Sequence, residues 1–234
     1  MGKGWKKAGK LEAAAKKGAV FTKLAREIAV AAKMGGGDPA SNSRLKLAID
    51  AAKEASVPKD TIERAIKKGT GQLEDGAQIE EIVYEGYGPH GVGIIVECQT
   101  DNRTRTVSEM RNIFKSNGGN LGESGAVAWM FERVSMIQGK NAKVRDPEEE
   151  AIEAGANEVE KEDDASYTFY GAPSDLDAIR TALSGRGWEI TVAELSFKAK
   201  DTTKIDQAQR AEVLELLEAI DDNDDSHRVY ATIE

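Results

Sequence analysis

Cysteine and histidine are scarce in this 234-residue chain, which contains one cysteine, Cys98, and two histidines, His90 and His227. One cysteine excludes an internal disulfide and a cysteine-based zinc site, and two histidines leave little for metal binding or acid–base catalysis. The fingerprints of phosphate-binding loops, dinucleotide-binding loops and the nucleophile elbow are missing as well. We therefore expect a protein that is not an enzyme, with no catalytic residue, no metal and no cofactor.

Long apolar runs are also lacking, since no stretch of about eighteen apolar residues occurs. The sequence thus predicts no membrane-spanning helix and no membrane partner. The start, MGKGWKKAGKLEAAAKKG, is basic but lacks the apolar stretch of a secretory signal, so we expect a cytoplasmic location. Cys98 alternates with Val92, Ile94 and Val96, which predicts a buried core residue. The acidic runs 146–164 and 221–225 lack the pattern of a calcium loop and predict solvated surface.

The net charge of −9 conceals an asymmetry along the chain. Residues 1–70 contain sixteen lysines and arginines against seven acids, a balance of +9, so the remaining residues carry −18. A basic segment attached to an acidic body suggests a polyanionic partner for the basic segment. The alternative is ordinary surface charge on lysine-rich helices.

Apolar residues recur at three- and four-residue spacing through the first seventy residues, which predicts helices. The first helix ends at Gly35-Gly36-Gly37, where glycine can adopt the left-handed conformation of a helix end. Asp38-Pro39 suits a second helix start, and Val57-Pro58 separates the second helix from a third that ends at Gly69. We expect residues 1–76 to form a basic helical bundle.

From about residue 79 the apolar period changes to two, which predicts strands at 79–88, 91–99 and 126–133, with helix 104–116 between the last two. The middle of the chain then predicts strand 134–138, helix 147–154, strands 157–161 and 166–170, helix 174–185 and strand 189–197. This β-α-β-β-α-β order is ferredoxin-like, and Ser174 with Asp177 resembles a capping box. Helix 206–220 and strand 228–233 follow.

We expect the strands and helices before and after this middle unit to form a second α/β sandwich of the same kind. We therefore expect an α+β fold, in which an N-terminal helical bundle is followed by two ferredoxin-like α/β domains, the second inserted in the first. The expected domains are residues 1–76, residues 77–133 plus 203–234, and residues 134–202.

The basic segment supplies the candidate nucleic-acid-binding residues, because each lysine or arginine on a phosphate releases a counterion. The string KKGTG at 67–71 joins two lysines to exposed N–H groups, and is either a phosphate site or a plain helix stop. Trp5 either stacks on an unpaired base or anchors the N-terminal arm. The candidate cations are Lys3, Lys6, Lys7, Lys10, Lys16, Lys17, Lys23, Arg26, Lys33, Arg44, Lys46, Lys67 and Lys68.

Residues 100–106 read TDNRTRT, a polar stretch between a predicted strand and the helix at 104–116. Asp101 or Asn102 is suited to cap this helix. Arg103 and Arg105 are unexpected, because cations at a helix N-terminus oppose its dipole. We interpret the two arginines as an anion clamp for either a nucleic-acid phosphate or a carboxylate from another domain.

Several strings of the chain resemble the YebC/PmpR family, which also includes the mitochondrial translational activator of cytochrome c oxidase. The strings are FTKLAREIAVAAKMGGGDPASNSRL, PKDTIERAIKKGTG, YEGYGP, VECQTDNRTRTVSEMR and GGNLGESGAVAWMF, spread over residues 20–132. Where the family commonly has Gly-Pro-Gly-Gly, this chain has Gly88-Pro89-His90-Gly91. The resemblance implies a helical N-terminal domain followed by two α/β domains around a cleft.

The resemblance also implies a function, in two forms that charge alone does not separate. One is a regulator of transcription that binds DNA. The other is a translation factor that binds ribosomal RNA or tRNA on the ribosome and relieves stalling at difficult sequences such as proline runs. The −18 body would repel extended nucleic acid, so we expect local docking rather than wrapping. A third alternative, by analogy of fold alone, is an enzyme or ligand sensor that uses the cleft.

Overall fold

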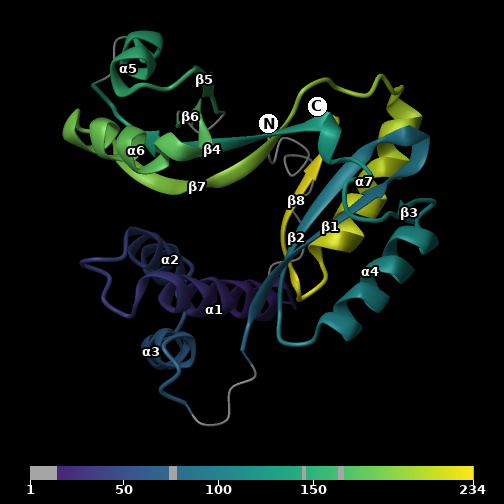
Figure 1. The fold of residues 1–234 in the computed structure, drawn as a ribbon, viewed down its shortest axis with the longest axis horizontal. Coiled ribbons are helices and arrows are strands. Elements are labelled where there is room, and N and C mark those ends of the chain that lie inside the picture. Colours follow the sequence, from purple (N-terminus) through teal and green to yellow (C-terminus); the bar gives the residue numbers. More distant parts are fainter. Residues whose placement is uncertain (1–14, 74–77, 144–145, 163–165, 234) are drawn as a thin grey trace. The chain divides into compact units, whose positions relative to one another are not determined.

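The fold is given by a computed structural model, in which the structure describes residues 15–73, 78–143, 146–162 and 166–233. The chain divides into two compact units, Met1–Glu132 with Ala199–Glu234, and Arg133–Lys198. The second unit interrupts the sequence of the first, which confirms the predicted insertion (Figure 1). Among the described helices, none is long and apolar enough to cross a membrane.

Three helices form the N-terminal part of the first unit: α1 (Ala15–Gly35), α2 (Ser43–Glu54) and α3 (Lys59–Gly69). Their apolar stripes meet in one core, where Ile28 and Leu45 are fully buried. Helix α2 begins later than Asp38-Pro39 predicted, because Asn42 is its N-cap. The Asn42 side-chain oxygen accepts a hydrogen bond from the Leu45 N–H, and its amide donates to two carbonyls at the end of α1.

The first unit also contains a four-stranded antiparallel sheet in the order β3-β1-β2-β8. Its strands are β1 (Glu80–Tyr87), β2 (Gly93–Thr100), β3 (Asn120–Leu121) and β8 (Ser226–Ala231). Helices α4 (Arg103–Ser116) and α7 (Gln207–Asp221) cover one face (Figure 1). Cys98 is 1% exposed there, on the same face as Val92, Ile94 and Val96, which confirms the predicted alternation.

The second unit follows the predicted β-α-β-β-α-β order, with a sheet in the order β5-β6-β4-β7. Its elements are β4 (Phe131–Lys140), α5 (Pro147–Ala154), β5 (Glu158–Lys161), β6 (Tyr167–Gly171), α6 (Leu176–Gly185) and β7 (Glu189–Ala199). Trp188 anchors its core, with edge-on contacts to Tyr167 and Phe169. The capping box predicted at Ser174 is wrong, because a 3₁₀ turn precedes α6 and the Ser174 hydroxyl bonds to Asp175.

Residues 126–133 do not form the single strand that their pattern predicts. Ala128–Met130 is a 3₁₀ turn, Phe131 begins β4, and the third strand of the first sheet is the short β3. The cause is Glu85 on β1, whose buried carboxylate accepts hydrogen bonds from three backbone N–H groups of the preceding loop. Two of these donors, the N–H groups of Val127 and Ala128, belong to the predicted strand and are therefore not free to pair with a neighbouring strand.

The division into three domains, at 1–76, 77–133 plus 203–234, and 134–202, stays a prediction. We expect an excised fragment of residues 134–202 to fold alone, because Ile137, Phe169, Leu183 and Trp188 give it a core of its own. Trp188 is the fragment's single tryptophan and is 3% exposed, so its fluorescence reports folding. A cooperative thermal transition is expected, whereas solvent-exposed emission without a transition would contradict the division.

Candidate nucleic-acid interface

A buried carboxylate, Asp225, lies between α7 and β8 and meets arginines from α1 and α4. Arg26 Nη1 and Arg105 Nη2 are 2.8 and 2.9 Å from its two oxygens, and the Thr106 hydroxyl donates to it at 2.7 Å. Burial acts to raise the pKa of Asp225, but hydrogen bonds from Thr106 and Arg105 and the charge of Arg26 hold that pKa below its usual range. The prediction of solvated surface is therefore wrong for Asp225, whose side chain is 3% exposed.

A second buried carboxylate, Glu27 of α1, joins the helical segment (α1, α2 and α3) to the sheet of the first unit. Arg44 binds it in bidentate fashion, with Nε and Nη2 at 2.8 and 3.1 Å. Gln99 on β2 donates to it at 2.7 Å, and His227 Nε2 on β8 lies 3.1 Å away. Burial acts to raise the pKa of Glu27, but hydrogen bonds from His227 and Arg44 hold that pKa well below its usual range.

Three candidate cations, Lys23, Arg26 and Arg44, are therefore engaged inside the first unit. The Lys23 ammonium contacts the carbonyl of Asp221 and lies 3.8 Å from its carboxylate. Arg26 also donates to the Asp224 carbonyl, and Arg44 lies 2.7 Å from Glu81. These cations join α1 and α2 to acidic residues of α7, β1 and the segment before β8, while their contact with nucleic acid stays a prediction.

The two arginines of the predicted anion clamp, Arg103 and Arg105, also differ in their partners. Asn102 caps α4, as predicted, by accepting a hydrogen bond from the Arg105 N–H. Arg105 then turns to Asp225 and Asp101, so carboxylates of its own unit account for this cation. Arg103 is 70% exposed and lies 3.9 Å from Glu80, so a phosphate at Arg103 stays a prediction.

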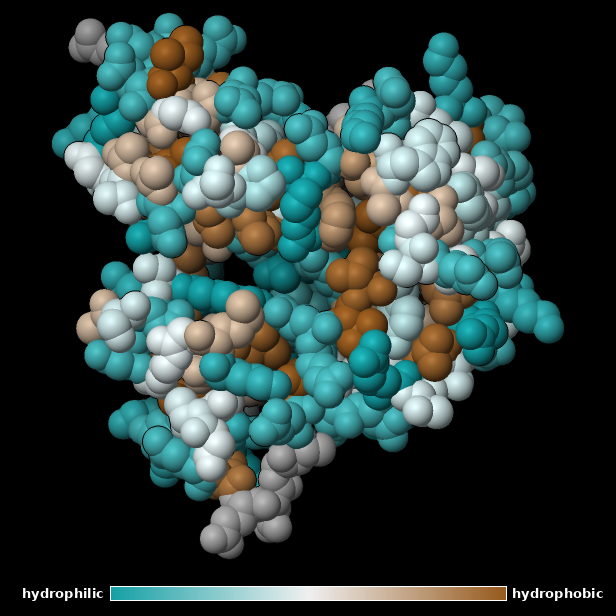
Figure 2. Space-filling model, viewed as in Figure 1, coloured by the Kyte–Doolittle hydropathy of each residue, from teal (hydrophilic) through white to brown (hydrophobic). Residues whose placement is uncertain are grey.

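A different group of cations faces outward. Lys46, Lys67 and Lys68 have no acidic partner among the described residues, and the first two are exposed. Lys33 is also exposed and donates to the Ile79 carbonyl at 3.2 Å. In Figure 2 hydrophilic residues cover much of the helical segment, with apolar side chains visible between its helices. Lys3, Lys6, Lys7, Lys10 and Trp5 lie outside the described residues, and Lys16 and Lys17 fall on α1 without described side chains.

The string KKGTG is a helix stop and not a backbone phosphate cradle. The N–H groups of Thr70, Gly71 and Gln72 donate to carbonyls of the last turn of α3. Gly71 has a φ of 73°, in the left-handed region that glycine adopts freely. Because these donors are taken and a helix C-terminus attracts cations, an anion at this end must be held by the side chains of Lys67 and Lys68.

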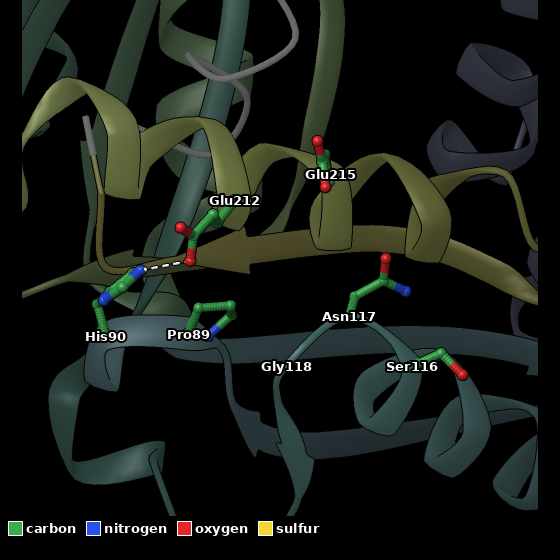
Figure 3. A pocket seen from close by; sticks show the side chains of 7 residues that line it. All are labelled: Pro89, His90, Ser116, Asn117, Gly118, Glu212 and Glu215. Carbon is green, nitrogen blue, oxygen red and sulfur yellow. Dashed lines mark hydrogen bonds and ion pairs between the residues drawn. The ribbon is translucent and has the colours of Figure 1, made fainter.

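Among the described residues, the side chains that could take part in catalysis are either unreactive or not placed together. Burial raises the pKa of the Cys98 thiol to about 12, so it is not a thiolate near neutral pH. A shallow pocket of 470 Å³ brings His90 within 2.8 Å of Glu212 on α7 (Figure 3). Ser116 lines the same pocket but lies at its other end and points away from His90 (Figure 3). No group of three or more metal-ligating side chains occurs in the described part of the chain.

Sequence reasoning missed Glu27, Gln99 and Asp225, the residues that organise this region. One signal was present, because Glu27 falls inside the apolar stripe of α1 that runs from Leu24 to Ala31. A charged residue on a buried stripe indicates a buried partner. The identity of the partners could not be predicted from the sequence, because Gln99 and His227 are distant from Glu27 along the chain.

We predict that Glu27→Gln lowers the free energy of unfolding by about 2 kcal/mol, because it removes the buried carboxylate that Arg44, Gln99 and His227 share, while Arg44 keeps Glu81. Urea denaturation at neutral pH measures the change. Glu54→Gln is the matched control, since Glu54 is exposed at the end of α2, and it should change stability by less than about 0.5 kcal/mol.

The pH dependence follows from the lowered pKa values of Glu27, Glu81 and Asp225. Since the unfolded chain takes up these protons first, their stabilisation is complete above the unfolded-state values of about 4 and is lost as the pH falls below them. Glu27→Gln should therefore lose less stability than the wild type between neutral pH and about pH 3. An equal loss in both proteins would contradict the assignment of Glu27.

Comparison with known proteins matches the chain along most of its length. Residues 3–72 match the model of the TACO1/YebC protein N-terminal domain, and residues 79–233 match that of the TACO1/YebC second and third domain. A protein of Bdellovibrio bacteriovorus named "Probable transcriptional regulatory protein Bd1964" is 64% identical over 233 residues, with both chains fully covered. One of Pelotomaculum thermopropionicum, named "Probable transcriptional regulatory protein", is 49% identical over 94% of this chain and 91% of its own.

A solved structure agrees with these matches. The crystal structure of the conserved hypothetical protein Aq1575 from Aquifex aeolicus has a TM-score of 0.85 and 42% identity, and covers 97% of this chain and 94% of its own. Sequence and fold point the same way over nearly the whole chain, which therefore belongs to the TACO1/YebC family.

Proposed function

We propose that the protein is a non-enzymatic regulator of gene expression in the cytoplasm that binds DNA through α2 and α3. The observation that carries this proposal is the group Lys46, Lys67 and Lys68, which has no acidic partner among the described residues. Lys23, Arg26 and Arg44, by contrast, are engaged with acids. Cations that the fold leaves unneutralised are the ones that can release counterions from phosphates.

The chemistry of these lysines favours contact with the backbone of the nucleic acid. The N–H groups after α3 are taken by carbonyls, so the anion is met by flexible ammonium groups and not by a rigid cradle. Ammonium groups position a duplex without reading its bases. The names of the relatives, which call them probable transcriptional regulatory proteins, support DNA as the partner.

The absence of catalysis is part of the proposal. The thiol of Cys98 is buried and protonated near neutral pH, and His227 is placed against the Glu27 carboxylate. His90 faces Glu212, while the nearest lining hydroxyl, Ser116, points elsewhere in Figure 3. A nucleophile held by a base is therefore not assembled at either histidine in the described residues.

The double variant Lys67→Gln with Lys68→Gln tests the proposal. We expect about tenfold weaker binding to duplex DNA, and a salt dependence whose logarithmic slope is smaller by about 2, because two phosphate contacts are lost. Fluorescence anisotropy over a series of salt concentrations measures both quantities.

Lys59→Gln is the matched control on the same helix, since Lys59 is exposed but lies 3.5 Å from Glu63. It should leave both quantities close to those of the wild type. An unchanged slope in the double variant would overturn the assignment of α3. A ribosomal RNA fragment that binds far more tightly than promoter DNA would replace transcription with translation as the process regulated.

A further inference from the structure

An exposed tryptophan stands on the 3₁₀ turn Ala128–Met130, where the chain leaves the first unit. Trp129 is 65% exposed and is the only aromatic residue among the large apolar side chains exposed in the described part of the chain. Folded proteins usually bury most of such a ring, whose contact area dominates cores and interfaces. A tryptophan ring that a well-defined turn leaves in solvent is suited to contact with a partner, because tryptophan is enriched at interfaces.

The turn is held by the sheet beneath it. The Glu85 carboxylate, 9% exposed, accepts hydrogen bonds from the N–H groups of Gly125, Val127 and Ala128 at 2.8–2.9 Å. The Tyr87 hydroxyl donates to the Ala126 carbonyl at 2.9 Å. These bonds fix the backbone of the turn from which the Trp129 side chain projects.

The ring presents only its apolar surface to a partner. Its single donor, Nε1–H, is already bonded to the Ala126 carbonyl at 3.1 Å. Beside it, the exposed Lys200 donates one ammonium proton to the Trp129 carbonyl at 2.9 Å. The remaining protons of that ammonium are available to an anion. The turn thus combines a π surface with an adjacent cation.

We propose that Trp129 is a stacking platform for an unpaired nucleobase, with Lys200 on the neighbouring phosphate. This deepens the proposed function and rests on it. A ring without a free donor suits stacking, which tolerates any base, better than hydrogen-bonded readout. A single splayed base needs only the ring and one cation.

The test compares Trp129→Ala with Trp129→Phe in the full-length protein. The probes are a labelled oligothymidylate of about 15 nucleotides and a duplex of the same length. We expect Trp129→Ala to bind the single strand about tenfold more weakly, with duplex binding unchanged, and Trp129→Phe to recover most of the loss. Lys200→Gln should lower the salt slope for the single strand by about 1. Ile152→Ala, which removes another exposed apolar side chain, is the control.

The outcomes separate this inference from the proposed function. If the lysine double variant weakens binding and Trp129→Ala changes neither probe, the inference falls and the proposed function stands. If the wild type binds neither probe, both fall. Equal weakening of single strand and duplex by Trp129→Ala also overturns the inference, as does failure of phenylalanine to recover binding when both variants melt at the wild-type temperature. If Trp129 instead contacts a protein partner, Trp129→Ala would change the binding of neither probe.

Discussion

The helical segment is placed on the first sheet by two buried carboxylates, Glu27 and Asp225. The helices have their own apolar core and the sheet has another, and a small apolar cluster of Ala29, Val30 and Ile79 joins α1 to the residue before β1. A buried carboxylate tolerates few alternatives, because losing one partner leaves an uncompensated charge. Arg26 and Arg44 must therefore remain where the acids are. The direction in which α2 and α3 present their lysines depends on this charge network.

The spacing of apolar residues predicted most of the helices and strands, because interactions between residues close in the sequence determine these elements. The helix at 147–154 agrees residue for residue, and the β-α-β-β-α-β order of the inserted unit follows from alternation and spacing alone. Failures occurred where a distant residue competes with local preference. Glu85 accepts hydrogen bonds from the N–H groups of Val127 and Ala128, which a strand at 126–133 would use, and no residue within that stretch indicates this contact. Likewise Asn42 starts α2 because its amide also reaches the end of α1.

The sequence indicated which segment of the chain is the candidate site, but not which of its cations have acidic partners in the fold. Charge asymmetry indicated the first seventy residues, and a count of cations treats all of them alike. The structure separates Arg26, whose acid is near the other end of the chain, from Lys67, which has none among the described residues. That distinction depends on tertiary contacts between distant residues, which single-sequence spacing does not encode.

Phosphate contact and base stacking are both tolerant of sequence. A regulator that relies on Lys67, Lys68 and an exposed Trp129 would consequently choose its target by structure and not by base order. An unpaired base at a defined place beside a phosphate backbone is such a structure. The remainder of the chain, at −18, reinforces this choice, because its net negative charge disfavours nucleic acid away from local cationic points. Selectivity would then come from the few geometries in which a polyanion reaches those points and avoids the acidic body.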